Sequence, residues 1–463
     1  MDASAAAPMA DLIGARLDRL PATRTVWRLV VLLSIGGWFE FYDLFLTGYV
    51  APGLIKSGLY TAATKGFFGI NGFASFVAAF FAGLFVGTLA FGFVADRFGR
   101  RSIFTTSLLW YCACTAIMAF QGSANGVNLW RFLSGIGVGV ELVTIDTYIS
   151  ELVPKGLRGR AFAVNQTIQF AVVPVVAALA WWLVPQAPLG LDGWRWVMLI
   201  GAAGAIFVWF LRRGVPESPR WLAAHGRMAD ADRVTSAIEA GVQRDIGRAL
   251  PPPGPGLPVE QRGSFAEIWQ GKYLSRTVML IIFNIFQTVG FYGFANWVPT
   301  FLVKQGITAT TSLGYTSIIA LAAPLGPLLC TGIADRIERK WLIVLAAGSV
   351  AVFGLVFSQM TAAVGVIVLG ALLTLANNVM SFSFHAYQTE LYPTRIRAVA
   401  VGFVYSWSRI SVVFMAFVIA FFLDRFGVFG VFALIAGSMA VVMLAIGILG
   451  PRTRNRALEA ISG

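Results

Sequence analysis

The sequence predicts an all-α membrane protein in which twelve transmembrane helices form two six-helix bundles, with both termini in the cytoplasm. Hydrophobic residues make up 57% of the 463 positions and charged residues only 12%, with a mean hydropathy of +0.75, whereas soluble domains carry roughly 25% charged residues. A membrane-spanning helix needs about 20 consecutive apolar residues. Such stretches lie at 28–50, 74–94, 102–121, 127–149, 161–184, 195–213, 276–300, 311–333, 341–360, 363–386, 398–423 and 427–449.

The chain contains an internal duplication. ELVP at 151–154 recurs as ELYP at 390–393, an offset of 390 − 151 = 239 residues. GTLAFGFVADRFGRR at 87–101 recurs as GPLLCTGIADRIERK at 326–340 with the same offset, 326 − 87 = 239. Each motif follows a long apolar run, so the repeated unit is a group of membrane helices. Two such halves around a central path are typical of many membrane transporters.

The distribution of positive charge predicts the topology. The formal net charge is +13, which in a soluble protein would suggest a nucleic-acid partner. Of the 35 Lys and Arg residues, five fall on one side of the predicted membrane and two within spans, which leaves 28 on the other side. Because cytoplasmic loops carry the excess of Lys and Arg, both termini are predicted to be cytoplasmic and no nucleic-acid partner is expected. The five are Lys56, Lys65, Arg195, Lys304 and Arg425, and the two are Arg131 and Arg409.

These patterns divide the chain into five segments. A cytoplasmic tail (1–27) precedes the first bundle (28–213), and the second bundle (276–450) is followed by another cytoplasmic tail (451–463). Between the bundles lies a polar linker (214–275) interrupted by the run PPPGPG. The linker is too small for a hydrophobic core of any depth, so we expect short surface helices there and no catalytic domain.

Neither metal binding nor enzymatic chemistry is predicted. Cys112 and Cys114 are two positions apart in one span, so they point to different faces of a helix, and Cys330 lies in the other half. The two His residues, His225 and His385, are far apart in the chain. No cluster of His, Cys and carboxylate side chains suggests a metal site, a cofactor or a catalytic centre.

Five motifs, in order, resemble those of the major facilitator superfamily. GTLAFGFVADRFGRR is similar to the family's signature loop between helices 2 and 3, and its copy at 326–340 is where the family keeps a degenerate one. RFLSGIGVGVE (131–141), YISELVPKGLRGR (148–160) and PESPRWL (216–222) are similar to the sugar-porter and organic-ion branches. YQTELYPTRIRA (387–398) resembles most closely the organic-ion and aromatic-acid symporters. The resemblance implies the major facilitator fold and solute transport by alternating access.

The loop motifs predict a cytoplasmic gate between the halves. Asp96 and Asp335 fall at helix ends, where carboxylates can meet Arg side chains and the N-terminus of a neighbouring helix. Gly87 is expected to let helix backbones approach closely. The alternative is that these charges only anchor the topology. The expected gate pairs Glu151 with Arg158 and Glu390 with Arg397, and also includes Asp96, Arg97, Arg101, Glu217, Arg220, Asp335 and Arg336.

Charges inside spans indicate the coupling site, because each costs about 2.5 to 3.5 kcal/mol at the bilayer centre. Asp43 lies seven residues before Val50, near the outer end of the first span, and Arg131 lies six residues after Asn125 in the fourth, so both lie at the same depth. The resemblance to proton-coupled sugar porters implies that Asp43 takes the coupling proton and pairs with Arg131. A purely structural salt bridge is the alternative.

Three further acids belong to the same two spans. Glu40 is one turn from Asp43 on the same helix face and is a second candidate proton carrier. Glu141 and Asp146 lie nearer the cytoplasmic end of the fourth span, and each is either an inner-gate partner or an acid that reaches the membrane surface. Asp146 stands where the sugar-porter pattern has Pro, which weakens a sugar assignment.

Arg409 is the only ionised group predicted inside the second group of spans. A cation at this depth requires an anion, and a substrate carboxylate would accept two hydrogen bonds from its guanidinium group. Polar and aromatic residues are predicted to form the walls of the substrate site around it, although helix packing explains any single one equally well. They are Gln166, Gln169, Asn284, Gln287, Tyr292, Asn296, Asn377, Asn378, His385, Tyr405 and Trp407.

The sequence therefore favours a transporter, not an enzyme, that couples proton movement to the uptake of a small organic or aromatic carboxylate. Its expected partners are this small-molecule substrate and the lipid bilayer of the cytoplasmic (inner) membrane, and a monomer is expected. The proton is the coupling ion and no cofactor is expected. Two alternatives stay open: a proton-coupled sugar or polyol symporter, and a proton-driven efflux antiporter.

Overall fold

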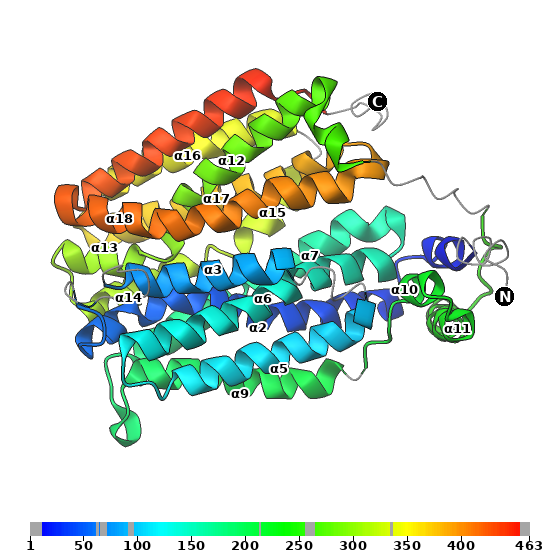
Figure 1. The fold of residues 1–463 in the computed structure, drawn as a ribbon, viewed down its shortest axis with the longest axis horizontal. Helices are drawn as coiled ribbons and strands as arrows, with labels where there is room; N and C mark the ends of the chain where they lie inside the picture. The colour runs from blue at the N-terminus through cyan, green and yellow to red at the C-terminus, as the bar shows by residue number, and fades with distance from the viewer. Residues whose placement is uncertain are drawn as a thin grey trace.

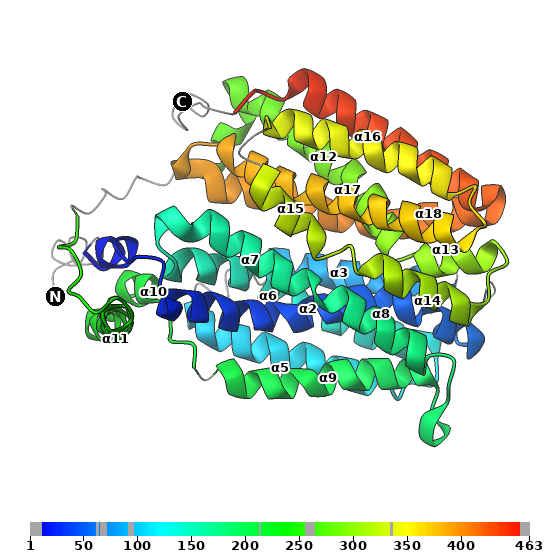
Figure 2. The ribbon, with the colours of Figure 1, turned by 180° about the vertical axis from the view of Figure 1, so that it is seen from behind.

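The computed structural model describes residues 12–61, 64, 72–90, 97–212, 214–254, 264–333 and 337–453. Within these ranges the regular secondary structure is helical, and the described chain contains no β-strand. Most of the long helices run roughly along the longest axis of the molecule, as both ribbon views show (Figures 1 and 2). The predicted all-α architecture is therefore confirmed for the described residues.

The first half of the chain forms one layer of long helices. The first predicted span is the helix α2, which carries the candidate coupling acids, and α6 carries Arg131 opposite it. The helices of this half are α2 (Arg24–Lys56), α3 (Ala74–Ala90), α5 (Arg100–Met118), α6 (Ala124–Leu152), α7 (Arg158–Phe170), α8 (Val172–Leu183) and α9 (Gly193–Arg212).

The second half forms a matching layer, shown in colours from green (α12) through yellow to red (Figure 1). Its helices α12, α17 and α18 carry most of the polar residues predicted for the substrate site. The elements of this half are α12 (Gly271–Ala295), α13 (Val298–Lys304), α14 (Ala309–Ala320), α15 (Leu325–Ile333), α16 (Arg339–Phe357), α17 (Ala363–Glu390), α18 (Thr394–Leu444) and the terminal π-turn η5 (Ala445–Leu449).

Several of the predicted spans differ from a single straight helix. The stretch 161–184 is divided into α7 and α8, since Pro174 cannot donate a backbone hydrogen bond to Phe170, and 311–333 is divided into α14 and α15 in the same way by Pro324. The stretches 398–423 and 427–449 are joined in α18 across a sharp break at Gly427, whose φ is 66°. Among the described residues, eight helices are long and apolar enough to cross a membrane. The number of twelve spans stays a prediction.

Glycines bring α3 and α6 into backbone contact. A Cβ atom on Gly83 would collide with the carbonyl of Phe132, and one on Gly87 with the carbonyl of Ile136. In return, Gly135 of α6 lies directly against the backbone of α3. The close helix approach predicted for Gly87 is confirmed, and this is how small residues hold membrane helices together in the absence of a hydrophobic driving force.

The two layers meet along the middle of the molecule. α18 packs on α3, α14 on α8, α15 on α7 and α13 on α2, so every contact joins a helix of the first half to a helix of the second. Near the end that holds α13 and α14, the rings of Phe73 and Trp297 are 5.5 Å apart in an edge-to-face contact. Side chains buried between the layers are therefore placed where relative motion of the halves would expose or enclose them.

A small polar assembly covers the opposite end of the first half (Figure 1). It consists of the helical residues 12–18, α10 (Pro219–Ala224) and α11 (Met228–Ile246). Its core is a separate hydrophobic cluster that includes Leu17 and Val242. We call this assembly the cap. The part of the linker that follows it, η4 (Phe265–Trp269), packs on α12 and α18 of the second half.

Ion pairs attach the N-terminal helix to α11. Arg16 donates to Asp232 and Glu239, with a distance of 2.7 Å to the Oε2 atom of Glu239, and Arg19 donates to the other oxygen of the same carboxylate. Burial would raise the pKa of Glu239, but the hydrogen bonds from Arg16 and Arg19 outweigh it and hold that pKa below its ordinary value. Glu239 therefore stabilises the cap in its ionised form.

We expect Glu239→Gln to release residues 12–20 from α11, measured as faster amide hydrogen exchange of that segment at pH 7. Because the folded pKa is depressed, the stabilisation is present above the unfolded pKa and is lost as the pH falls through the folded value. The difference between the wild type and the variant should therefore shrink at acidic pH. Asp230→Asn is the control, since among the described residues Asp230 forms ion pairs with Arg227 and Arg233 at the start of α11 and none with the N-terminal helix. Equal exchange in the two variants would contradict this role.

Candidate functional site

A buried ion pair joins α2 to α6. Arg131 is inaccessible to solvent, and its Nη1 atom donates to Oδ2 of Asp43 at 3.0 Å. Its Nη2 atom donates to the backbone carbonyl of Asp43 at 2.7 Å and to the hydroxyl of Thr47. The guanidinium also lies over the ring of Phe80, 3.9 Å from the centroid. Asp43 and Arg131, which the sequence places at the same depth, are therefore in direct contact.

Two hydroxyl groups complete the surroundings of the carboxylate. Thr115 of α5 donates to Oδ1 of Asp43 at 3.0 Å, and Ser134 of α6 donates to Oδ2 at 2.8 Å. Ser134 is one helical turn after Arg131, a spacing that could have identified it from the sequence. Each carboxylate oxygen therefore has a hydrogen-bond donor, which a buried charge in a medium of low dielectric requires.

Arg409 forms a second buried cationic site, on α18. Its Nη1 atom donates to the hydroxyl of Tyr292 at 2.7 Å, and its Nη2 atom donates to the hydroxyl of Tyr405 at 2.8 Å. The ring of His385 is 5.2 Å from that of Tyr405, and its Nδ1 atom is 2.7 Å from the carbonyl of Ser381. A guanidinium group has five N–H donors, so three remain after the two tyrosine bonds.

Acids of the first half face this cation across the interface. Glu40 of α2 is buried, with 1% of its surface exposed, and both Glu40 and Asp146 of α6 lie within electrostatic range of Arg409. Asp146 is exposed although it lies on a long apolar helix. Glu141 is fully buried on the same helix. Glu40 and Asp146 therefore place negative charge near Arg409, although no carboxylate among the described residues contacts its guanidinium group.

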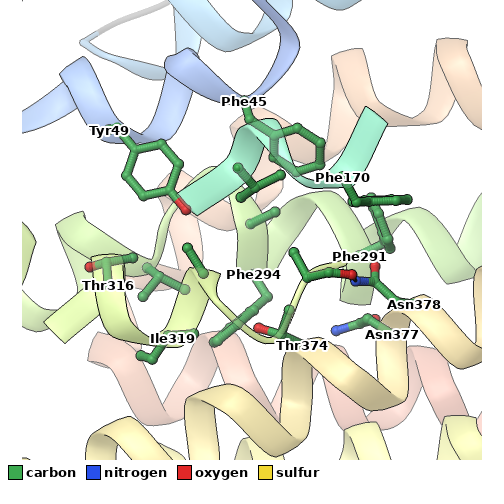
Figure 3. Close-up of a pocket in the computed structure, with 15 residues that line it drawn as sticks. Phe45, Tyr49, Phe170, Phe291, Phe294, Thr316, Ile319, Thr374, Asn377 and Asn378 are labelled. Carbon is green, nitrogen blue, oxygen red and sulfur yellow. Dashed lines mark hydrogen bonds between the residues drawn. The ribbon is translucent and has the colours of Figure 1, made fainter. Parts of the chain in front are cut away.

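An apolar pocket lies beside this cluster, between the two halves (Figure 3). It has an empty volume of about 470 Å³, open in part to the surroundings. Phe45 and Tyr49 of α2 line one side, and Thr374, Asn377 and Asn378 of α17 line the other. Phe291 of its wall is next to Tyr292 on α12, with ring centroids 5.0 Å apart, so the pocket and the cationic site share neighbouring residues of this helix.

The structure places the other predicted wall residues at different depths. Asn284, Gln287, Gln169 and Asn296 are buried, and Gln166 is half-buried. Asn296 lines a smaller cavity with Tyr292, on the side of α18. The aromatic residues Phe45, Tyr49, Phe170 and Phe291 were not predicted, because an aromatic residue in a transmembrane span gives no sequence signal that separates a pocket wall from a lipid-facing side chain.

Trp407 does not belong to the site. It is 36% exposed, and its ring contacts Phe403, which packs in turn against Phe265 and Trp269 of η4. Two positions along a helix correspond to about 200°, so Trp407 and Arg409 point to opposite sides of α18. The prediction that Trp407 flanks the substrate was wrong because it relied on closeness in sequence.

The predicted gate is described only in part, since Asp96, Asp335 and Arg336 lie outside the described residues. The expected pair of Glu151 with Arg158 is wrong: Glu151 pairs with Arg100 at 3.0 Å, and Arg158 faces Asp18 at 3.9 Å. The turn η2 (Lys155–Leu157) separates α6 from α7 and directs the first residue of α7 toward the N-terminal helix.

The second expected gate pair is also wrong. Glu390 pairs with Arg339 at the start of α16, while Arg397 donates to the carbonyl of Tyr392 at 3.1 Å. The carboxylate of Glu217 accepts hydrogen bonds from the backbone amides of Arg100 and Arg101 at the start of α5, as a negative charge at a helix N-terminus should.

The remaining gate residues lie beside the cap. Arg220 donates to the carbonyl of Glu151 and, at 2.8 Å, to Asp18. Arg97 is exposed and lies against the ring of Phe98. Asp18 was missed as a partner because the tail gave no periodic signal. The charges at this end therefore connect the first half with the cap, so far as the described residues show.

The fold and these buried charges define a membrane transporter, and comparisons with known proteins agree. The model of the Sugar (and other) transporter family matches residues 29–463. The putative metabolite transport protein YyaJ of Bacillus subtilis is 32% identical, over 96% of both chains. The niacin transporter NiaP of Acinetobacter baylyi is 29% identical, over 97% of this chain and 99% of its own. The partially occluded inward-open xylose transporter XylE of E. coli has a TM-score of 0.71 at 20% identity, covering 93% of this chain and 99% of XylE.

The chain belongs to the Sugar (and other) transporter family, within the major facilitator superfamily. It is a multi-pass transporter of the cytoplasmic membrane and not an enzyme, as predicted from the sequence. The likeness to XylE shows that it has the all-helical major facilitator fold.

We expect Gly48→Leu to open the end of the molecule where α2 meets α12. A Cβ atom on Gly48 would lie 2.8 Å from the carbonyl oxygen of Ala295 and 2.9 Å from that of Asn296, and both are backbone atoms that cannot move aside. The variant should therefore favour the conformation in which the two halves separate at this end. Alkylation of a cysteine introduced at Phe73, by a membrane-impermeant maleimide, should become several-fold faster.

Gly402→Leu is the matched control, because a Cβ atom at Gly402 meets no other atom within 4 Å. If Gly48→Leu and Gly402→Leu give the same alkylation rate, Gly48 does not control the closure of this end.

Proposed function

We propose that the protein takes up a small organic carboxylate together with a proton, by alternating access across the cytoplasmic membrane. One observation carries the proposal: Arg409 is buried between the halves, bonded to two tyrosine hydroxyls and to no carboxylate among the described residues. A substrate carboxylate would accept the remaining guanidinium hydrogens in a bidentate arrangement. The aromatic pocket beside it would hold the body of the substrate.

The proposed coupling site is Asp43 with Arg131. In the ion pair, Asp43 is bonded to Arg131, Thr115 and Ser134, all from helices of the first half. A proton on Asp43 would cancel its charge and release Arg131, so the helices α2 and α6 would gain a second stable arrangement. The substrate carboxylate would take over the charge interaction with Arg409 that Glu40 makes in its absence. The proton is the only coupling ion in this proposal, and no cofactor takes part.

The proposed architecture follows the sequence prediction. Twelve spans form two bundles, 28–213 and 276–450, joined by the linker 214–275, with the tails 1–27 and 451–463 in the cytoplasm. The excess of Lys and Arg at one end supports this orientation. The two bundles would rock about the central site, with the charged residues of the loop motifs forming the cytoplasmic gate.

A neutral sugar or polyol is the second candidate substrate. The family model and the likeness to XylE favour it, whereas the niacin transporter NiaP favours an acid, since niacin is an aromatic carboxylic acid. A sugar offers hydroxyl groups only and would leave the charge of Arg409 without a counter-ion of its own. The contacts of Arg409 therefore favour the carboxylate. Efflux by proton antiport is less well supported. The drug-efflux branch is typified by a Gly-rich motif containing Gly-Pro in its fifth helix, whereas α7 and α8 carry one Pro and no Gly between Ala161 and Leu183.

We expect Asp43→Asn to abolish accumulation of nicotinate driven by a pH gradient in proteoliposomes, because the side chain can no longer bind and release a proton. Counterflow exchange of nicotinate should persist, since exchange needs no net proton movement. Thr115→Val is the control, as it removes one hydrogen bond to Asp43 and keeps the carboxylate. Accumulation by Asp43→Asn at the wild-type level would show that another group carries the proton.

We expect the wild type to bind nicotinate in preference to nicotinamide, and Arg409→Gln to lose that preference. Removing one partner of a buried charge pair costs about 3 to 5 kcal/mol, which corresponds to a loss of more than 100-fold in affinity for the acid. Isothermal titration of the purified protein measures both ligands. Arg195→Gln, which removes a cation far from the site, should leave the preference unchanged. If the wild type does not distinguish the acid from the amide, the neutral-solute candidate is preferred.

A further inference from the structure

The pocket of Figure 3 contains a polar group that a carboxylate site does not explain. Asn377 of α17 is only 3% exposed, and neither Oδ1 nor Nδ2 of its amide has a hydrogen-bond partner among the described residues. Two neighbouring polar residues of the wall are bonded within the protein. Asn378 donates to the carbonyl of Ala323 at 2.8 Å, and Thr374 donates to the carbonyl of Gly370 at 2.9 Å.

A buried amide without hydrogen-bond partners lowers the stability of the ligand-free protein. A buried donor and acceptor lose their bonds to water and gain none in return. The surrounding wall cannot compensate, since it is largely aromatic and aliphatic, with Phe45, Phe170, Phe291 and Phe294 contributed by both halves. An apolar side chain of the same size would fit this wall at lower cost. The amide of Asn377 is therefore best explained by a ligand that supplies its missing hydrogen-bond donor and acceptor.

We propose that this pocket binds the ring of the transported carboxylate and that Asn377 selects a ring bearing, away from the carboxylate, a group with both a hydrogen-bond donor and an acceptor. A carboxamide has this chemistry, because its N–H and C=O match the Oδ1 and Nδ2 atoms of Asn377. This inference rests on the proposed function for the carboxylate end of the substrate. It adds a second recognition point, on a helix different from that of Arg409.

The geometry connects the two recognition points. Tyr292 lies between the two recognition points. Its hydroxyl accepts a hydrogen bond from Arg409, and its ring contacts that of Phe291 in the pocket wall. A flat ligand with its carboxylate at Arg409 would therefore extend along α12 toward α17. Sites built to hydrogen-bond a ligand reject analogues that lack the bonding group, because the protein's own polar atoms are then left without partners.

The test compares 3- and 4-carbamoylbenzoate with 3- and 4-acetylbenzoate, in which a methyl group replaces the NH₂ at nearly the same size. The wild type should bind the better carbamoyl isomer roughly tenfold more tightly than the corresponding acetyl compound, because the acetyl group keeps the carbonyl acceptor but leaves the buried Oδ1 atom of Asn377 without a donor. Asn377→Leu should lose this preference. Thr374→Val should keep it, because the Thr374 hydroxyl is already bonded to Gly370 in the same pocket.

Two further readouts separate the possible failures. Asn377→Leu should leave the melting temperature of the ligand-free protein unchanged or raise it, because the substitution removes a polar group without a partner. It should also keep the wild-type preference for benzoate over benzamide, which depends on Arg409. A lower melting temperature in Asn377→Leu, or equal binding of the carbamoyl and acetyl compounds by the wild type, would overturn the role of Asn377. Loss of the benzoate preference in the wild type would instead overturn the proposed function.

Discussion

A charged side chain in the membrane interior must be neutralised by its surroundings, and the two buried arginines meet this requirement in different ways. Arg131 is neutralised inside the first half by Asp43, whose carboxylate is held in turn by Thr115 and Ser134. Arg409 is bonded to two neutral tyrosine hydroxyls, and the acids within its electrostatic range, Glu40 and Asp146, belong to the other half. Arg131 has its carboxylate within the protein, whereas Arg409 has capacity for an anion from outside it.

This difference links charge to motion. The halves touch through aromatic rings and through the close approach of Gly48 to the end of α12, contacts that can separate without breaking a hydrogen bond. The cap packs on α2 and α6, while η4 packs on α12 and α18, so each part of the linker is attached to one half. Interactions between Arg409 and the acids opposite it therefore depend on how the halves are placed, and a substrate or a proton that changes them shifts the conformational equilibrium.

The sequence predicted the features that depend on periodicity and solvation. Long apolar runs, the duplicated loop motifs and the equal depth of Asp43 and Arg131 follow from the cost of charge in a bilayer, so they could be recognised without a structure. Partner choice at the helix ends could not: Glu151 contacts Arg100 and not Arg158, because a short turn redirects the chain by an angle that the sequence does not encode simply. Trp407 was misplaced because its neighbour in sequence points to the opposite side of α18. Asn377 was one polar residue among many until its lack of partners was visible.

The central claim is that binding of a carboxylate and binding of a proton are linked in one protein. Proton uptake on nicotinate binding, followed with a pH indicator in weakly buffered detergent solution, measures this linkage directly. The proposed mechanism predicts uptake of about one proton per nicotinate bound by the wild type, and none by Asp43→Asn. Nicotinate binding to the wild type without any proton uptake would contradict it.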